Sequence, residues 1–172
     1  MAGLLDGLIR RARAKSPWLI HYNCGSCNGC DIEVLACLTP MYDVERFGIV
    51  HMGNPRHADV LVVTGTVNQR NQRVLRNVYD QMADPKVVVA VGACANSGGV
   101  FHDCYNVVGG ADKVVPVDVY VNGCAVRPEA IIDGIVEALG KLDAKADAAA
   151  KARATTGKHA APTQRDATRV EV

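Results

Sequence analysis

The sequence predicts an α/β fold, a doubly wound domain built around a mainly parallel sheet. Three short runs rich in β-branched residues lie at 58–66, 86–94 and 117–124, and each contains a glycine near its end. Such runs are typical of strands that are buried on both faces, as the strands of a parallel sheet are. A segment with helical periodicity separates the first two runs, which predicts a strand–helix–strand unit followed by a third parallel strand.

Two segments have the periodicity of an amphipathic helix. The first lies between the first two strands, and Pro85 marks its end. Its apolar face consists of Val74, Leu75, Val78, Tyr79 and Met82. The second is expected to begin at Pro128, which suits the first turn of a helix, and to end at Gly140. Its apolar stripe consists of Ile131, Ile132, Ile135, Val136 and Leu139. A third, shorter helix is expected at 31–38, before Pro40. The predicted architecture is therefore a flavodoxin-like sheet with helices packed on it.

The chain is expected to fold as one domain with a segment at each end. Its 172 residues, of which 49% are apolar, are enough for one substantial core, which we place at 18–140. Residues 1–17 combine a small apolar face with a basic cluster, so they are expected to lie on a membrane surface, against another subunit or in solvent. Residues 141–172 are rich in Ala, Lys, Thr and Asp and are expected to form a flexible tail.

The composition excludes some classes of protein. Nineteen basic and eighteen acidic residues give a net charge of +1, so nothing indicates a nucleic-acid-binding surface. No apolar run is long enough to form a transmembrane segment, and the N-terminal residues do not have the form of an export signal. The seven cysteines are an odd number, and in a reducing cytoplasm clustered cysteines bind metal or carry out redox chemistry more often than they form disulfides.

The cysteines gather where the carboxyl ends of the strands are expected. Cys24, Cys27 and Cys30 precede the short helix at a spacing of three, while Cys94 and Cys124 follow the second and third strands. Because the carboxyl ends of parallel strands meet at one edge of a sheet, at least two of the first three cysteines would converge with the last two. Four thiolates are the ligand set of a cubane iron–sulfur cluster, and neighbouring glycines would let backbone N–H groups approach its sulfurs. A zinc ion held by four cysteines is the alternative.

Several motifs recur in the order seen in a known family. The resemblance rests on "CNGCDIE", "YDVERFG", "RHADVLVVTGTV", "GACANSGG", "DKVVPVDVYVNGC" and "RPEAI", and it covers roughly residues 18–140. The chain resembles the family that unites the small subunit of nickel–iron hydrogenases with the 20-kDa cluster-bearing subunit of respiratory complex I. Complex I relatives carry two adjacent cysteines at the first ligand site, whereas this chain has the C-x-x-C of the hydrogenase branch. The long C-terminal domain of uptake hydrogenases is missing, which makes the chain similar to the membrane-bound, energy-converting group.

The resemblance implies one 4Fe-4S cluster, proximal to a nickel–iron centre on a large partner subunit. The implied ligands are Cys27, Cys30, Cys94 and Cys124. Cys24 falls outside the family pattern. The resemblance also makes Glu33, three residues after a ligand, a candidate catalytic residue as a proton relay, although a structural ion pair explains it equally well. One departure is that Ala125 and Val126 stand where complex I relatives have two prolines after the last ligand.

The function implied by the resemblance is electron transfer within a larger enzyme. The chain would be the small subunit of a membrane-bound, energy-converting nickel–iron hydrogenase, whose hydrogen-activating site belongs to the hydrogenase large subunit. The other implied partners are a ferredoxin-like iron–sulfur subunit and integral membrane subunits that translocate ions. The chain would attach peripherally on the cytoplasmic side of the cell membrane. The cluster-bearing subunit of a complex I-like quinone or sulfur reductase is the alternative, and a zinc-binding structural module is a third interpretation.

Three residues near the motifs have structural interpretations. Cys37 lies on the apolar side of the short helix and is expected in the core. Cys104 is expected in a loop, and Asp31 is expected to cap the short helix.

Overall fold

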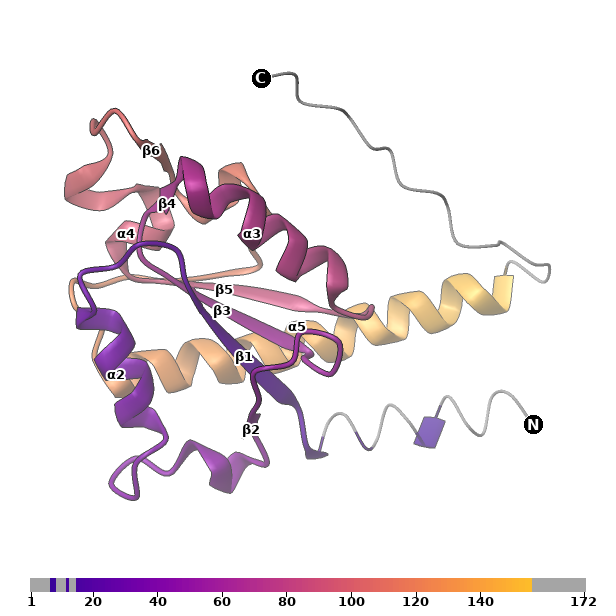
Figure 1. Cartoon of the computed structure of the whole chain (residues 1–172). Coiled ribbons are helices and arrows are strands. Elements are labelled where there is room, and N and C mark those ends of the chain that lie inside the picture. Colours follow the sequence, from indigo (N-terminus) through magenta and orange to yellow (C-terminus); the bar gives the residue numbers. More distant parts are fainter. Residues whose placement is uncertain (1–6, 9–11, 13–14, 156–172) are drawn as a thin grey trace.

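Five strands form one parallel sheet in the computed structural model, which describes residues 7–8, 12 and 15–155, with the side chains of 150–155 left out. The strands are β1 (Trp18–Asn23), β2 (Val50–His51), β3 (Val60–Thr64), β5 (Val87–Val91) and β7 (Val119–Val121). They lie in the order β2-β1-β3-β5-β7, and every neighbouring pair is parallel (Figure 1). This is the strand order of a flavodoxin-like sheet. The predicted doubly wound, mainly parallel α/β fold is confirmed.

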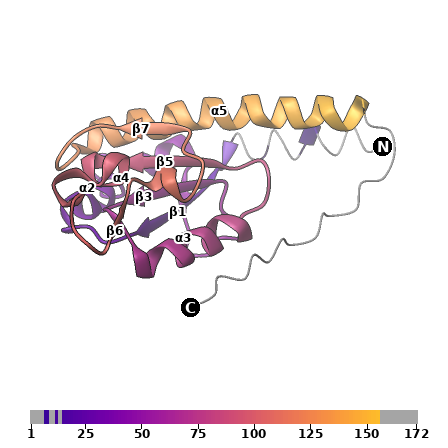
Figure 2. The same cartoon turned by 90° about the horizontal axis from the view of Figure 1, so that it is seen from above.

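Helices cover both faces of the sheet. α2 (Gly29–Cys37) and α5 (Pro128–Thr155) pack on one face, while α3 (Gln69–Gln81) packs on the other. Figure 2 shows α5 and α3 on opposite sides of the strands. The amphipathic segment expected at 1–17 lies outside the described residues except at 7–8, 12 and 15–17. Residues 156–172 of the expected tail lie entirely outside them.

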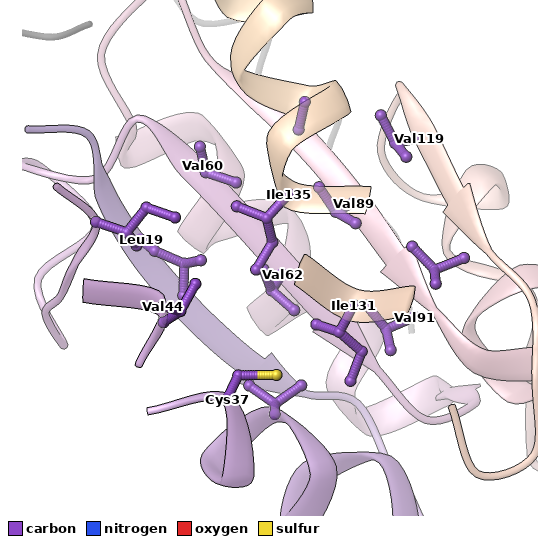
Figure 3. Packing of buried hydrophobic residues seen from close by; sticks show 14 of the residues in the cluster. Leu19, Cys37, Val44, Val60, Val62, Val89, Val91, Val119, Ile131 and Ile135 are labelled. Atoms are coloured by element: carbon purple, nitrogen blue, oxygen red, sulfur yellow. The ribbon is translucent and has the colours of Figure 1, made fainter. Parts of the chain in front are cut away.

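The strands divide their side chains between two apolar cores, because successive residues of a strand point to opposite faces. Val60 and Val62 of β3 lie in the core beneath α2 and α5, whereas Leu61 and Val63 lie in the core beneath α3. In the first core, Ile131 and Ile135 of α5 pack near Val62, Val89 and Val91 (Figure 3). Burial on both faces is why the strands read as nearly continuous apolar runs.

The sequence prediction has three strands and lacks β1 and β2. β1 pairs with β3 along its whole length, from Leu19 opposite Val60 to Asn23 opposite Thr64, so it lies in the interior of the sheet. Its sequence, WLIHYN, buries only Leu19 and Ile20 fully, with Tyr22 packed partly buried against the core beneath α3. A strand with two buried residues has no periodic signal of its own, and the pairing with β3 is what stabilises it.

The predicted helix between the first two strands exists, with one difference at its surface. The Asn68 side chain caps α3 by accepting a hydrogen bond of 2.8 Å from the backbone N–H of Asn71. Leu75 and Met82 are buried as expected, but Val74 is 45% exposed. Val74 lies one residue before Leu75, about 100° around the helix, and falls outside the apolar stripe.

The C-terminal helix is longer than predicted, because α5 does not end at Gly140 and continues to Thr155. Contacts beyond Gly140 hold the added turns against the sheet. Leu142 is buried in the core beneath α2 and α5. The Lys141 ammonium donates a hydrogen bond of 2.6 Å to the backbone carbonyl of Asp118, and the Lys145 ammonium lies 2.7 Å from the Asp118 carboxylate. A glycine inside a helix costs only about 1 kcal/mol, which these contacts offset. Val136, predicted in the stripe, is 47% exposed.

Replacing Leu142 with Ala is expected to lower the free energy of unfolding by about 2–5 kcal/mol, because the side chain is 3% exposed and its loss leaves a cavity. The control, Val136→Ala on the exposed side of the same helix, should change stability by less than about 0.5 kcal/mol. Urea denaturation of the full chain followed by circular dichroism measures both. Equal effects at the two positions would mean that the turns after Gly140 do not pack on the sheet.

Short elements gather at the carboxyl ends of the strands. β4 (Val67–Asn68) and β6 (Val107–Gly109) form an antiparallel ribbon, and α4 (Gly92–Ser97) directly follows β5. Figure 1 shows this ribbon, α4 and α2 at the same end of the sheet. Across the described ranges, every helix is too short or too polar to pass through a bilayer. The carboxyl end of the sheet is therefore where binding residues are expected.

Candidate metal centre

The four predicted ligand residues come from three segments that meet at this end of the sheet. Cys27 and Cys30 flank the start of α2, Cys94 lies in α4, and Cys124 follows β7. The segments touch through the backbone, since the N–H of Ala93 donates a hydrogen bond of 2.9 Å to the carbonyl of Gly123. Cys94 follows the second predicted strand, as expected, but the segment that carries it is the short helix α4.

Cys30 and Cys94 each lie within electrostatic range of the other three thiols. Burial raises the pKa of the Cys94 thiol, and Cys124, Cys27 and Cys30 raise it further. Burial likewise raises the pKa of Cys30, although a backbone N–H of Val126 that donates to its sulfur opposes the rise. Such thiols become thiolates when a metal displaces their protons, so metal binding would release protons here.

Glycines leave space beside the thiols that a side chain would fill. Gly92 has a φ of +88°, and a Cβ there would lie 2.6 Å from Sγ of Cys30. A Cβ on Gly99, with a φ of +55°, would lie 3.2 Å from Sγ of Cys94. Both positions adopt backbone conformations that favour glycine, and both face a thiol. The donor set and the space around it fit a sulfur-rich group such as an iron–sulfur cluster.

Cys27 and Cys124 are exposed, while Cys30 and Cys94 are partly buried. Four soft thiolate donors suit iron–sulfur clusters and zinc rather than magnesium or calcium. In the part of the chain that the structure describes, no three His, Cys, Asp or Glu side chains are close enough to hold a single metal ion. The open side of the site presents Cys27 and Cys124 to the surface.

The other cysteines lie in different surroundings. Cys24 is 0% exposed in the core beneath α3, and burial raises its pKa to about 12. Asn68 and Asn71 donate hydrogen bonds of 3.1 and 2.8 Å to its backbone carbonyl, which fixes the start of the loop. Cys37 is buried, as predicted, and its thiol lies 3.2 Å from the carbonyl of Glu33. Cys104 is exposed and lines a hollow of about 220 Å³ together with Cys27.

Asp31 does not cap α2, which corrects the prediction. The cap residue is Asn28, and the Asp31 carboxylate turns inward, where it is 8% exposed. Oδ1 accepts a hydrogen bond of 2.6 Å from the Thr64 hydroxyl and lies 2.9 Å from Nε2 of His21. Oδ2 accepts a bond of 3.0 Å from the Asn23 amide and another from the Ser26 hydroxyl.

These contacts join the cysteine-bearing loop to two strands, and sequence reasoning missed them. One signal was present in the sequence, because Asp31 shares the buried face of α2 with Val34 and Cys37, at a spacing of three. Burial lowers the pKa of His21, whereas the neighbouring carboxylate of Asp31 opposes this change.

Glu33, the candidate proton relay, is half-buried on α2. Burial raises the pKa of the nearby Tyr42 phenol, as do Glu129 and, to a smaller extent, Glu33. The Tyr42 hydroxyl lies 3.4 Å from the carboxylate of Glu129. Glu33 therefore lies near a second carboxylate and a phenol at the surface, apart from the buried Asp31 network.

Comparison with known proteins gives a consistent set of relatives. The model of a family described as "NADH ubiquinone oxidoreductase, 20 Kd subunit" matches residues 27–138. The chain is 53% identical over 128 residues to the probable membrane-bound hydrogenase subunit mbhJ of Pyrococcus furiosus, covering 74% of this chain and 77% of that protein. It is 49% identical over 133 residues to an NADH-quinone oxidoreductase subunit of Flavobacterium psychrophilum, with coverages of 77% and 71%.

The fold is also similar to that of a solved membrane complex. The chain superposes on one chain of the membrane-bound sulfane sulfur reductase, an archaeal respiratory membrane complex, with a TM-score of 0.69 and 39% identity. The superposition covers 80% of this chain and 76% of the other. The relatives thus belong to hydrogenase, quinone oxidoreductase and sulfur reductase complexes.

Proposed function

This chain belongs to the family of the NADH ubiquinone oxidoreductase 20-kDa subunit, and from that membership we propose that it is the electron-transfer small subunit of a membrane-bound, energy-converting nickel–iron hydrogenase. The observation that carries the proposal is that three segments bearing four cysteines come together at the carboxyl end of the sheet, where Cys30 and Cys94 each interact electrostatically with the other three thiols. The relatives are subunits of oxidoreductase complexes, and one of them is a probable hydrogenase subunit at 53% identity.

The chain's own residues bind and orient the redox group. Cys27, Cys30, Cys94 and Cys124 would hold one 4Fe-4S cluster as four thiolates, and the N–H of Val126 would stay bonded to the sulfur of Cys30. When bound, such a cluster supplies one-electron transfer. The exposed Cys27 and Cys124 place the site at the surface, where a partner can approach it. Glu33, half-buried beside Tyr42, is the residue we assign to proton movement near that surface.

The rest of the proposed enzyme lies on other subunits. The nickel–iron centre would belong to a large subunit, which would exchange electrons with this chain. A ferredoxin-like iron–sulfur subunit would connect it to the electron donor or acceptor, and integral membrane subunits would translocate ions. The chain would then be peripheral, on the cytoplasmic side of the cell membrane.

A second function is favoured by other comparisons. The 49% identity to a quinone oxidoreductase subunit and the structural similarity to a sulfane sulfur reductase support a cluster-bearing subunit of such a reductase. The C-x-x-C spacing of Cys27 and Cys30 favours the hydrogenase, because complex I relatives have adjacent cysteines at this site. Both functions use the same four thiols.

Metal analysis of the complex purified through a tag on this chain separates these functions. We expect stoichiometric nickel together with iron and acid-labile sulfide, because the large subunit of a nickel–iron hydrogenase carries the nickel. Iron and sulfide without nickel would support the quinone or sulfur reductase instead. Zinc without iron would contradict both and would support a structural zinc site.

A further inference from the structure

We propose that Asp31 is a positioning residue for the metal centre, whose buried carboxylate fixes the loop carrying Cys27 and Cys30 and places a negative charge beside Cys30. The inference rests on the proposed function, because it concerns the cluster that this function requires. It assigns a role to a residue that is neither a ligand nor part of the exposed surface.

The carboxylate divides its two oxygens between the sheet and the loop. Oδ1 faces the strands, where Thr64 donates to it at 2.6 Å and Nε2 of His21 lies at 2.9 Å. Oδ2 faces the loop, where it accepts bonds from the Asn23 amide and the Ser26 hydroxyl. One side chain therefore ties the start of α2 to β1, to β3 and to the loop.

The same contacts shape the loop itself. The Asn23 side-chain oxygen accepts bonds of 2.7 and 2.9 Å from the backbone N–H groups of Gly25 and Ser26. The Ser26 hydroxyl accepts a bond of 3.0 Å from the N–H of Asn28. Because Asn23 and Ser26 are both held by Asp31, the turn between them is fixed directly before Cys27 and Cys30.

Stability alone does not explain a buried carboxylate at this position. Val34 and Cys37 occupy the same face of α2 with apolar side chains. Replacing a buried ionic group with an apolar one of similar size is often neutral or stabilising, so packing does not require Asp31. A fixed negative charge next to Cys30 has another effect, since it disfavours the addition of an electron to a nearby cluster.

The test measures the midpoint potential and the electron paramagnetic resonance line shape of this chain's cluster in the purified complex. The signal that disappears in a Cys30→Ser complex is assigned to this chain. Asp31→Asn keeps the size of the side chain and removes its charge. Its NH2 group then replaces one carboxylate oxygen, so this donor faces the donor of either Asn23 or Thr64. We expect a shift of the potential to more positive values and an altered line shape. Asp43→Asn, the same change at an exposed position, should match the wild type.

Thr64→Val gives a second test that keeps the β-branched shape of the buried strand. It removes the hydroxyl that donates to Oδ1, so the carboxylate charge is less compensated and the potential should move to more negative values, opposite to Asp31→Asn. A wild-type potential and line shape in Asp31→Asn would overturn the inference. If that complex does not assemble, an unchanged potential in Thr64→Val overturns it. Failure of the proposed function is distinct, because it would be seen in the wild-type complex itself, either as iron and sulfide without nickel or, if the site holds no cluster, as the absence of the assigned signal.

Discussion

Serine in place of any one of Cys27, Cys30, Cys94 and Cys124 is expected to remove the cluster from this chain and to abolish hydrogen turnover by the purified complex. The four thiols come from three segments, and Cys30 and Cys94 each interact electrostatically with the other three, so in the proposed cluster each thiol would be one of four ligands. A serine hydroxyl is a harder donor that replaces thiolate poorly on iron. Iron content, electron paramagnetic resonance and hydrogen evolution measure the loss.

Two other cysteines serve as controls for these changes. Cys104→Ser alters an exposed thiol in the loop after α4, and Cys24→Ser alters a thiol that is buried beneath α3. Both should keep the cluster signal and most of the activity, although burying a hydroxyl at Cys24 costs about 1–3 kcal/mol of stability. If Cys24→Ser destroyed the cluster while Cys30→Ser spared it, the ligand pair would be shifted by one C-x-x-C step.

The parts of the fold that the sequence predicts are the elements whose own residues form a recognisable hydrophobic pattern. The strands β3 and β5 are nearly continuous apolar runs because both of their faces are buried, and each is followed directly by a glycine. β1 lacks such a run, although it lies between β2 and β3, because its position depends on backbone pairing along β3. The length of α5 likewise depends on contacts of Leu142 and Lys145 with the sheet, which Gly140 does not reveal.

The candidate site also has a part that the sequence predicts and a part that it does not. The cysteines are predictable because the carboxyl ends of parallel strands must meet, so residues far apart in sequence can be placed together. The Asp31 network is not predictable from strand order, because it needs the side-chain directions of Thr64, 33 residues away, and of His21. The predicted cysteines and the Asp31 network are connected, since the network fixes the loop that carries Cys27 and Cys30.

Gly92→Ala is the second change with a large expected effect. The residue joins β5 to α4 with a φ of +88°, and a Cβ there would lie 2.6 Å from Sγ of Cys30. Alanine adds backbone strain of about 1–3 kcal/mol and must also push the thiol away from its present position. Because four sulfurs have to surround one cluster, displacing one of them should remove most of the cluster iron. Iron and sulfide analysis of the purified complex measures this.

Two glycines separate this contact from the effects of alanine in general. A methyl group added at Gly53 would meet no atom within 4 Å, so Gly53→Ala should leave the cluster and the stability unchanged. Gly48 has a φ of +83° and would place a Cβ against the backbone of Lys15, far in sequence from every ligand. Gly48→Ala should therefore lower stability while the folded protein keeps its cluster. Full cluster content in Gly92→Ala, with a loss of stability like that of Gly48→Ala, would show that Cys30 has room to move and that Gly92 is needed only for the turn.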